Sequence, residues 1–133
     1  MDVVFLDANV LFSAAYRPQA GLLRLWRIRD ATLVTSAYAA EEARRNLAAA
    51  TQRERLENLL AAVRIVPEAP SPPDLPLPAT QLPEKDRPIL LAAAAAGATH
   101  LLTGDVSHFG PHFGHRLEGV LVLPPAQYLK QQR

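Results

Sequence analysis

The chain has 133 residues with a formal net charge of +1, and it contains no cysteine. This length fits one domain with a core of its own, and we expect residues 1–133 to form a single domain. The absence of cysteine excludes disulfides and Cys-ligated zinc or iron–sulfur sites. The near-neutral charge argues against binding nucleic acid through bulk positive charge, although a local basic rim would suffice.

Five short segments are predicted to be strands because they are apolar on both faces, as strands of a covered parallel sheet are. They are residues 3–6, 32–35, 63–66, 100–103 and 120–123. Segments with helical character lie at 20–29, 36–50, 52–62 and 85–97, with a short one after Pro125. Strands that alternate with helices predict an α/β sandwich with a mostly parallel sheet.

The stretch from Pro67 to Pro88 holds eight of the twelve prolines. Proline density of this kind excludes a regular helix or a central strand, so we expect a surface connection over about 67–83. The remaining sequence gives no sign of a membrane protein, because no apolar run reaches the ~20 residues of a span. Asp2 and Asp7 interrupt the first apolar run, which is unlike a signal peptide. We therefore expect a cytoplasmic protein.

Two aspartates follow predicted strands directly or nearly so. Asp7 comes after the first strand, and Asp105 follows the fourth, separated only by Gly104. Ligands of open parallel sheets bind outside the carboxyl ends of the strands, so both side chains are expected at one edge. Taken alone, either residue is better explained as a turn former or a helix N-cap.

The segment "SAYAAEEARRNL" predicts a helix with Ser36 as its N-cap. Its buried face is marked by Ala39, Ala43 and Leu47. At 100° per residue, Glu41 faces solvent and is expected to pair with Arg45, whereas Glu42 lies at the border of the buried face. Glu42 is either a charge on the helix flank or a residue that faces a cleft beside the sheet.

A fourth carboxylate lies in "LPEKDRPILLAAAAAG", where Pro88 is tolerable only in the first turn of a helix. This places Asp86 near the N-cap, so capping is one explanation of its presence. If the four carboxylates share one edge, they repel each other by several kcal/mol at ~4 Å, unless cations are bound. Carboxylate and water ligands suit Mg²⁺ or Mn²⁺, which assist phosphodiester hydrolysis.

The order of these motifs resembles the PIN domain family, the fold of the VapC-type toxin ribonucleases. The resemblance covers almost the whole chain: "FLDANVLFS", then "TSAYAAEEARRNL", then "EKDRPILLAAAAAGATHLLTGD", and finally "VLVLPPAQYL". The third block is the most specific. The family implies a three-layer α/β/α sandwich and a metal-dependent ribonuclease, often a homodimer and often a toxin neutralised by an antitoxin protein. A catalytically weak PIN-like module that binds RNA or protein is the alternative.

Carried over residue by residue, the resemblance assigns an acidic set that would hold Mg²⁺ or Mn²⁺ and carry catalysis: Asp7, Glu42, Asp86 and Asp105. Asn9 and Thr103 match supporting polar positions near the metal. The chain departs from the family pattern at Pro88, and again after "TGD", where His108 replaces another acidic residue.

Three further residues are candidates for contact with RNA. Lys85 and Arg87 flank Asp86 and are expected to contact phosphates, or to be ordinary solvated charges. His108 has four alternatives: a weak metal ligand, a proton donor to the leaving group, a phosphate contact or a partly exposed loop histidine.

Overall fold

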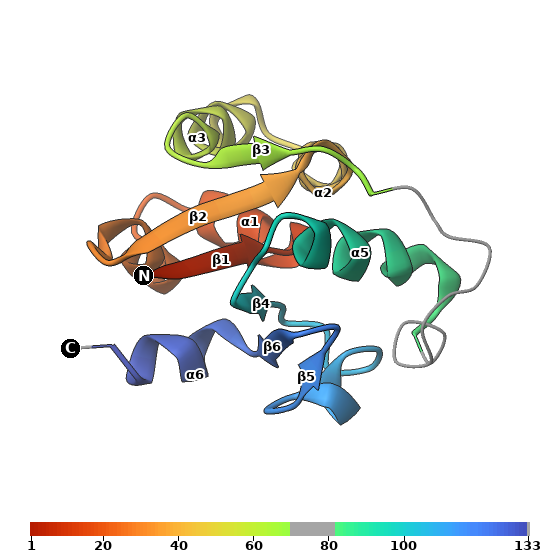
Figure 1. Ribbon diagram of the computed structural model, residues 1–133. Coiled ribbons are helices and arrows are strands. Elements are labelled where there is room, and N and C mark those ends of the chain that lie inside the picture. The colour runs from red at the N-terminus through yellow and green to blue at the C-terminus, as the bar shows by residue number, and fades with distance from the viewer. Residues whose placement is uncertain (70–81, 133) are drawn as a thin grey trace.

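The sheet has six strands in the order β3-β2-β1-β4-β6-β5, and all neighbours pair in parallel except β5 and β6 (Figure 1). A computed structural model describes residues 1–69 and 82–132 of the chain. The strands are β1 (Asp2–Leu6), β2 (Ala31–Ser36), β3 (Arg64–Val66), β4 (His100–Leu102), β5 (Arg116–Leu117) and β6 (Val120–Leu123). The predicted class is thus confirmed, and most of the expected connection at 67–83 lies outside the described residues.

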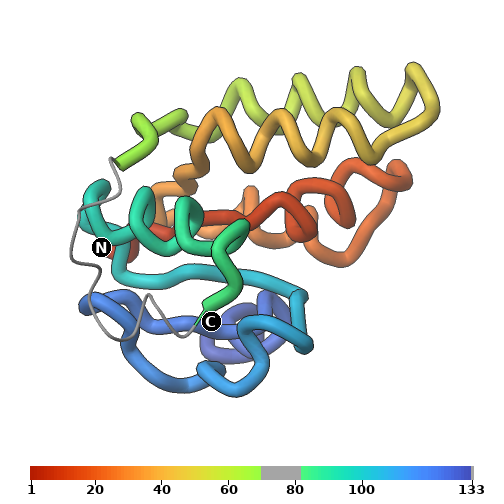
Figure 2. The backbone as a smooth tube through the Cα atoms, turned by 90° about the vertical axis from the view of Figure 1, so that its right-hand side faces the viewer, coloured from red at the N-terminus to blue at the C-terminus, as the bar shows by residue number. Residues whose placement is uncertain are grey.

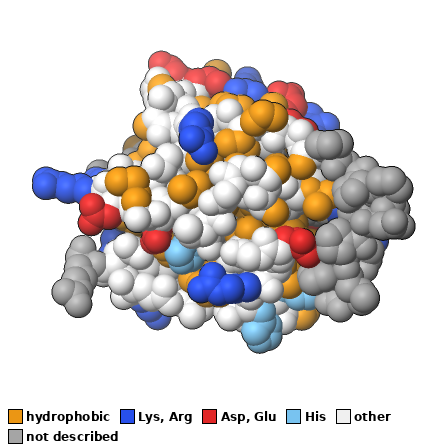
Figure 3. Space-filling model, in the orientation of Figure 1, with side chains coloured by type: hydrophobic (Ala, Val, Ile, Leu, Met, Phe, Trp, Pro, Cys, Tyr) orange, Lys and Arg blue, Asp and Glu red, His pale blue; other side chains and the backbone are white. Residues whose placement is uncertain are grey.

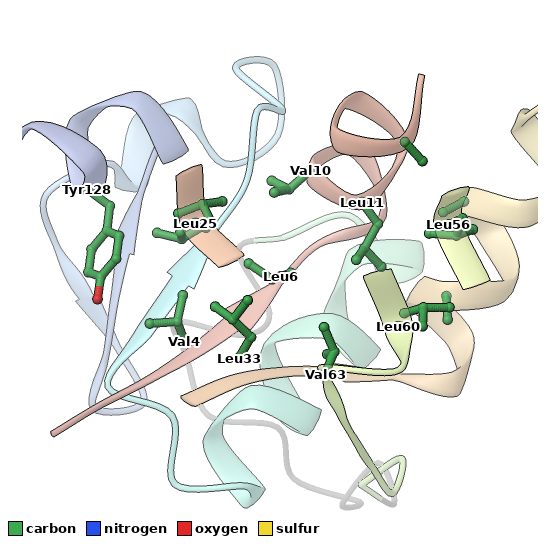
Figure 4. Close-up of a cluster of buried hydrophobic side chains, with 14 of the residues drawn as sticks. Val4, Leu6, Val10, Leu11, Leu25, Leu33, Leu56, Leu60, Val63 and Tyr128 are labelled. Atoms are coloured by element: carbon green, nitrogen blue, oxygen red, sulfur yellow. The ribbon is translucent and has the colours of Figure 1, made fainter. Parts of the chain in front are cut away.

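Helices cover both faces of this sheet, because successive strand residues point to opposite sides. The helices are α1 (Ala8–Ala15), α2 (Ala37–Asn46), α3 (Ala50–Leu60), α5 (Arg87–Ala95) and α6 (Pro125–Lys130), with 3-10 turns η1 (Gly21–Arg27), η2 (Glu84–Asp86) and η3 (Gly110–His112). On β1, Val4 and Leu6 pack with α1, η1, α2, α3 and α6, as Figure 4 shows in part. Phe5 packs on the other face with α5. Both faces are buried, which explains the unbroken apolar runs in the strand sequences.

Several predicted elements need correction. The helix α1 directly follows β1, although no helix was expected before residue 20. The segment of helical character expected over 20–29 is a 3-10 helix, η1, and the helix expected over 36–50 ends at Asn46. The hairpin strand β5 was also missed. Its two-residue loop consists of Glu118 and Gly119, both at positive φ, as the favoured hairpin turns require.

The helices α2 and α3 run side by side (Figure 2). Arg44 joins them through a bidentate contact with Glu57, at 2.6 and 3.0 Å. Arg44 also lies 3.3 Å from Glu41. Glu41 is exposed as expected, but its partner is Arg44 and not Arg45, because the i,i+3 spacing brings the pair together here.

Charges of both signs are scattered over the face shown in Figure 3, with no continuous basic patch. This agrees with the near-neutral composition. Among the described residues, no helix is long and apolar enough to cross a membrane.

The pairing of β1 with β4 fixes the position of the first candidate site residue. Leu6 is opposite Leu102 in the register, and the Asp7 amide donates to the Leu102 carbonyl at 3.1 Å. Asp7 and Thr103 are therefore the first residues past the ends of two adjacent strands. The parallel sheet places both of them at its carboxyl edge.

Candidate metal centre

A cleft of about 300 Å³ opens at the carboxyl edge of the sheet. The four carboxylates singled out in the sequence all line it: Asp7, Glu42, Asp86 and Asp105. They come from separate parts of the chain, namely the end of β1, the helix α2, the turn η2 and the loop after β4. Like charges around one opening repel one another unless protons or cations are bound.

Asp7 is the most buried of the four, with 6% of its surface exposed. It is the N-cap of α1, and its Oδ1 accepts from the Ala8 amide at 2.7 Å. Its Oδ2 accepts from the Thr103 hydroxyl at 2.8 Å. Burial raises the pKa of Asp7 to about 6, and the charges of Glu42 and Asp86 add to the rise, although the Thr103 and Ala8 hydrogen bonds oppose it. Asp7 is therefore both a helix cap and a destabilised anion that a cation would stabilise.

Asn9 and Thr103 hold the Asp7 carboxylate in place. Asn9 Nδ2 lies 3.3 Å from Asp7 Oδ2 and 3.2 Å from Thr103 Oγ1, while Asn9 Oδ1 accepts from the Gly104 amide at 2.7 Å. The Thr103 hydroxyl also accepts from the Asp105 amide at 3.1 Å. One buried hydroxyl thus links two of the carboxylate-bearing residues, as expected of a supporting position.

His108 lies against the other two aspartates. Its Nδ1 is 2.8 Å from Asp86 Oδ2 and 3.1 Å from Asp105 Oδ2, and its amide donates to Asp105 Oδ1 at 3.0 Å. The three side chains offer ligand atoms within 4.8 Å of one another. His108 is a partly exposed loop histidine whose imidazole faces two of the carboxylates.

The contact between His108 and Asp86 is short but badly directed for a hydrogen bond. Among the described residues, His108 Nδ1 and Asp86 Oδ2 are buried side-chain atoms without a hydrogen-bond partner. Burial raises the pKa of Asp86, with Asp105 adding to the rise and His108 and Lys85 opposing it. Although Asp86 is the N-cap residue of α5, its side chain makes no capping hydrogen bond. Capping therefore does not explain this carboxylate.

The donor set fits a divalent cation. An unpartnered buried carboxylate oxygen is costly on its own, and a cation would satisfy it. Carboxylate oxygens are the ligands that Mg²⁺ and Mn²⁺ prefer, and imidazole is tolerated by Mn²⁺. The unpartnered Oδ2 of Asp86 and the raised pKa of Asp7 therefore both favour a bound cation.

The predicted basic residues fall into two groups. Lys85 is exposed and lines the cleft, where it is free to meet an anion. Arg87 is half-buried, and its Nε donates to the Leu82 carbonyl at 3.1 Å, so it helps to fix the start of α5. The structure adds Phe12 and Asn46 to the cleft lining, and neither was foreseen. The missed helix α1 explains Phe12, which lies one turn after Ala8.

Comparisons with known proteins agree with this geometry. Residues 3–107 match a family profile described as PIN domain. No curated protein matches the sequence significantly.

Two solved structures share the fold. One is VapBC2 from Rickettsia felis, bound to a DNA fragment from their promoter: the TM-score is 0.66 at 12% identity, over 92% of this chain and 98% of that chain. The other is Mycobacterium tuberculosis VapC20, a Sarcin-Ricin loop cleaving toxin, with a TM-score of 0.54 at 14% identity, over 83% of this chain and 95% of that chain. At these identities the likeness establishes the fold, while the family match covers most of the sequence. The chain belongs to the PIN domain family.

Proposed function

We propose that the protein is a metal-dependent endoribonuclease that hydrolyses RNA phosphodiester bonds. The observation that carries the proposal is the convergence of four carboxylates on one cleft, with the buried Oδ2 of Asp86 left without a hydrogen-bond partner. Asp7, Glu42, Asp86 and Asp105 would hold Mg²⁺ or Mn²⁺. Such a cation supplies positive charge to the reacting phosphate and lowers the pKa of a water molecule.

The remaining residues orient the Asp7 carboxylate or bind the substrate. Asn9 and Thr103 keep Asp7 aimed into the cleft through their hydrogen bonds. Lys85 is placed at the exposed rim to attract a phosphate, and Arg87 supports the backbone beside it. His108 contacts Asp86 and Asp105, two of the carboxylates that line the cleft, and would support a phosphate or cation bound there.

The biological role we propose is that of a cytoplasmic toxin with a protein antitoxin, acting as a homodimer. Family membership and the likeness to VapC folds support this role. A partner antitoxin would be encoded beside this chain, and co-purification of that neighbour tests the pairing directly. Sedimentation of the purified chain tests the homodimer.

Activity is tested by a metal-titrated cleavage assay on a mixed RNA pool, which reports cut-site preference as well. The parent should cleave with Mn²⁺ or Mg²⁺ and stop in EDTA. Asp7→Asn and Asp105→Asn should each abolish cleavage, because each removes a charged ligand. Glu54→Gln, which removes an exposed charge on α3, should cleave like the parent.

Asn variants that cleave at the parental rate would refute the assigned chemistry. A parent that binds RNA without cutting it would instead favour the catalytically weak binding module.

A further inference from the structure

A second and larger groove, of about 540 Å³, lies between α1, η1 and α6. Phe12 on α1 lines both this groove and the acidic cleft, so the two openings are neighbours on the surface. We call it the α1–η1–α6 groove. A strand of RNA held at the carboxylates would have this groove beside it.

The groove presents aromatic surface. The rings of Phe12 and Tyr16 lie one helical turn apart with centroids 5.3 Å from each other, and Tyr16 is 54% exposed. The Tyr16 backbone is fixed from α3, because Gln52 Nε2 and Arg55 Nη2 donate to its carbonyl at 3.1 and 3.2 Å. An exposed ring on a fixed backbone is a ready stacking surface for a flat partner.

The rim of the groove is basic. Arg17, Arg24 and Lys130 line it and are exposed, and none of the described residues that line it is acidic. None of these three cations pairs with a carboxylate in the described part of the chain, whereas Arg44 elsewhere is paired twice. Arg24 also lines the adjoining cleft, to which Arg27 and Arg29 contribute. Asp30 lines that adjoining cleft as well, so among the described residues the uncompensated excess of cations belongs to the α1–η1–α6 groove itself.

We infer that the α1–η1–α6 groove binds single-stranded RNA next to the scissile phosphate. A base stacks on Tyr16 and Phe12, while Arg17 and Arg24 contact the flanking phosphates. Charge complementarity supports this occupant, because three exposed cations line the groove and a nucleic-acid strand carries one anionic phosphate per nucleotide. The inference rests on the proposed ribonuclease function and adds how its substrate is held.

The test measures binding apart from cleavage. A fluorescein-labelled, mixed-sequence RNA of twelve nucleotides is titrated with protein in Ca²⁺, and anisotropy gives Kd at several salt concentrations. Tyr16→Ala should weaken binding roughly tenfold through loss of stacking. Tyr16→Phe keeps the ring and should bind like the parent. Arg17→Gln and Arg24→Gln should each lower the slope of log Kd against log salt by about 0.7, the value for one lost phosphate contact on a single strand.

The control is Arg64→Gln, which removes an exposed cation from β3 that does not line the groove. It should leave both Kd and the salt slope unchanged. Unchanged binding in Tyr16→Ala and Arg24→Gln, or equal losses in Arg64→Gln, would overturn the inference. So would a parent that fails to bind the RNA, or a Tyr16→Ala chain that loses self-association while keeping its RNA affinity.

Measuring cleavage and binding separately distinguishes the ribonuclease activity from RNA binding in the groove. RNA that binds through the groove but is never cut in Mn²⁺ contradicts the ribonuclease and leaves the groove assignment standing. RNA that is cut equally well by the parent and by Tyr16→Ala, with equal Kd, contradicts only the groove.

Discussion

The raised pKa of Asp7 makes the metal-free protein sensitive to pH in a defined direction. Its carboxyl has a pKa of about 6 in the folded state against 3.8 ordinarily. The folded state therefore holds the proton more tightly than the unfolded chain. The stability from this group is fully present below pH 3.8 and is lost as pH rises through about 6. A rise of about two pKa units is worth about 3 kcal/mol, at 1.36 kcal/mol per unit.

The assay is urea denaturation in EDTA between pH 4 and pH 7, on the parent and on Asp7→Asn. The parent should lose stability as pH rises, and the variant should lose up to about 3 kcal/mol less, because Asn carries no titrating proton. The raised pKa of Asp86 contributes in the same direction to both proteins, so the difference between them reports Asp7. If the free energies of unfolding of the two proteins change in parallel with pH, burial does not raise the pKa of Asp7.

Three further substitutions test the packing around the site by urea denaturation. Thr103→Val removes the hydroxyl that links Asp7 to the Asp105 amide and should lower the free energy of unfolding by about 1–3 kcal/mol. A change below about 0.5 kcal/mol would contradict this hydrogen-bond network. Leu11→Ala empties a fully buried position of α1 and should cost about 2–5 kcal/mol, whereas a near-neutral result would mean that α1 is not packed on the sheet. Arg44→Gln breaks an exposed pair and should cost less than about 1 kcal/mol, a loss that 1 M salt should erase if it is electrostatic.

The sheet was predictable because its strands follow a simple pattern, whereas the complete acidic set was assigned through the resemblance to the PIN domain family. Strands buried on both faces are recognisable as apolar runs, and adjacent parallel strands bring their carboxyl ends together, so Asp7 and Asp105 could be assigned to one edge. Helical periodicity distinguished Glu42 from the exposed Glu41 but left two alternatives for it, a charge on the helix flank or a residue facing a cleft, and the structure has it lining the cleft. The predicted pairing of Glu41 with Arg45 was wrong because neighbours at i+3 and i+4 are both within reach of a helical side chain, and the side-chain rotamers decide between them.

Other features depend on tertiary structure that a sequence pattern does not contain. The helix α1 was missed because its apolar residues continue the run of β1, with only Asp7 to mark the boundary as an N-cap. The contact of His108 with Asp86 joins residues 22 positions apart, and no local spacing indicates it. The hairpin of β5 carries Glu-Gly in its loop, a weaker signal than Asn-Gly or Asp-Gly.

If the four carboxylates together hold a divalent cation, calorimetric titration of Mn²⁺ should detect its binding. The parent should bind Mn²⁺ at pH 7, Glu54→Gln should bind with the same affinity, and Asp7→Asn and Asp105→Asn should each weaken binding at least tenfold. Equal Mn²⁺ affinity in all four proteins, or no binding by the parent, would show that these carboxylates do not form a cation site.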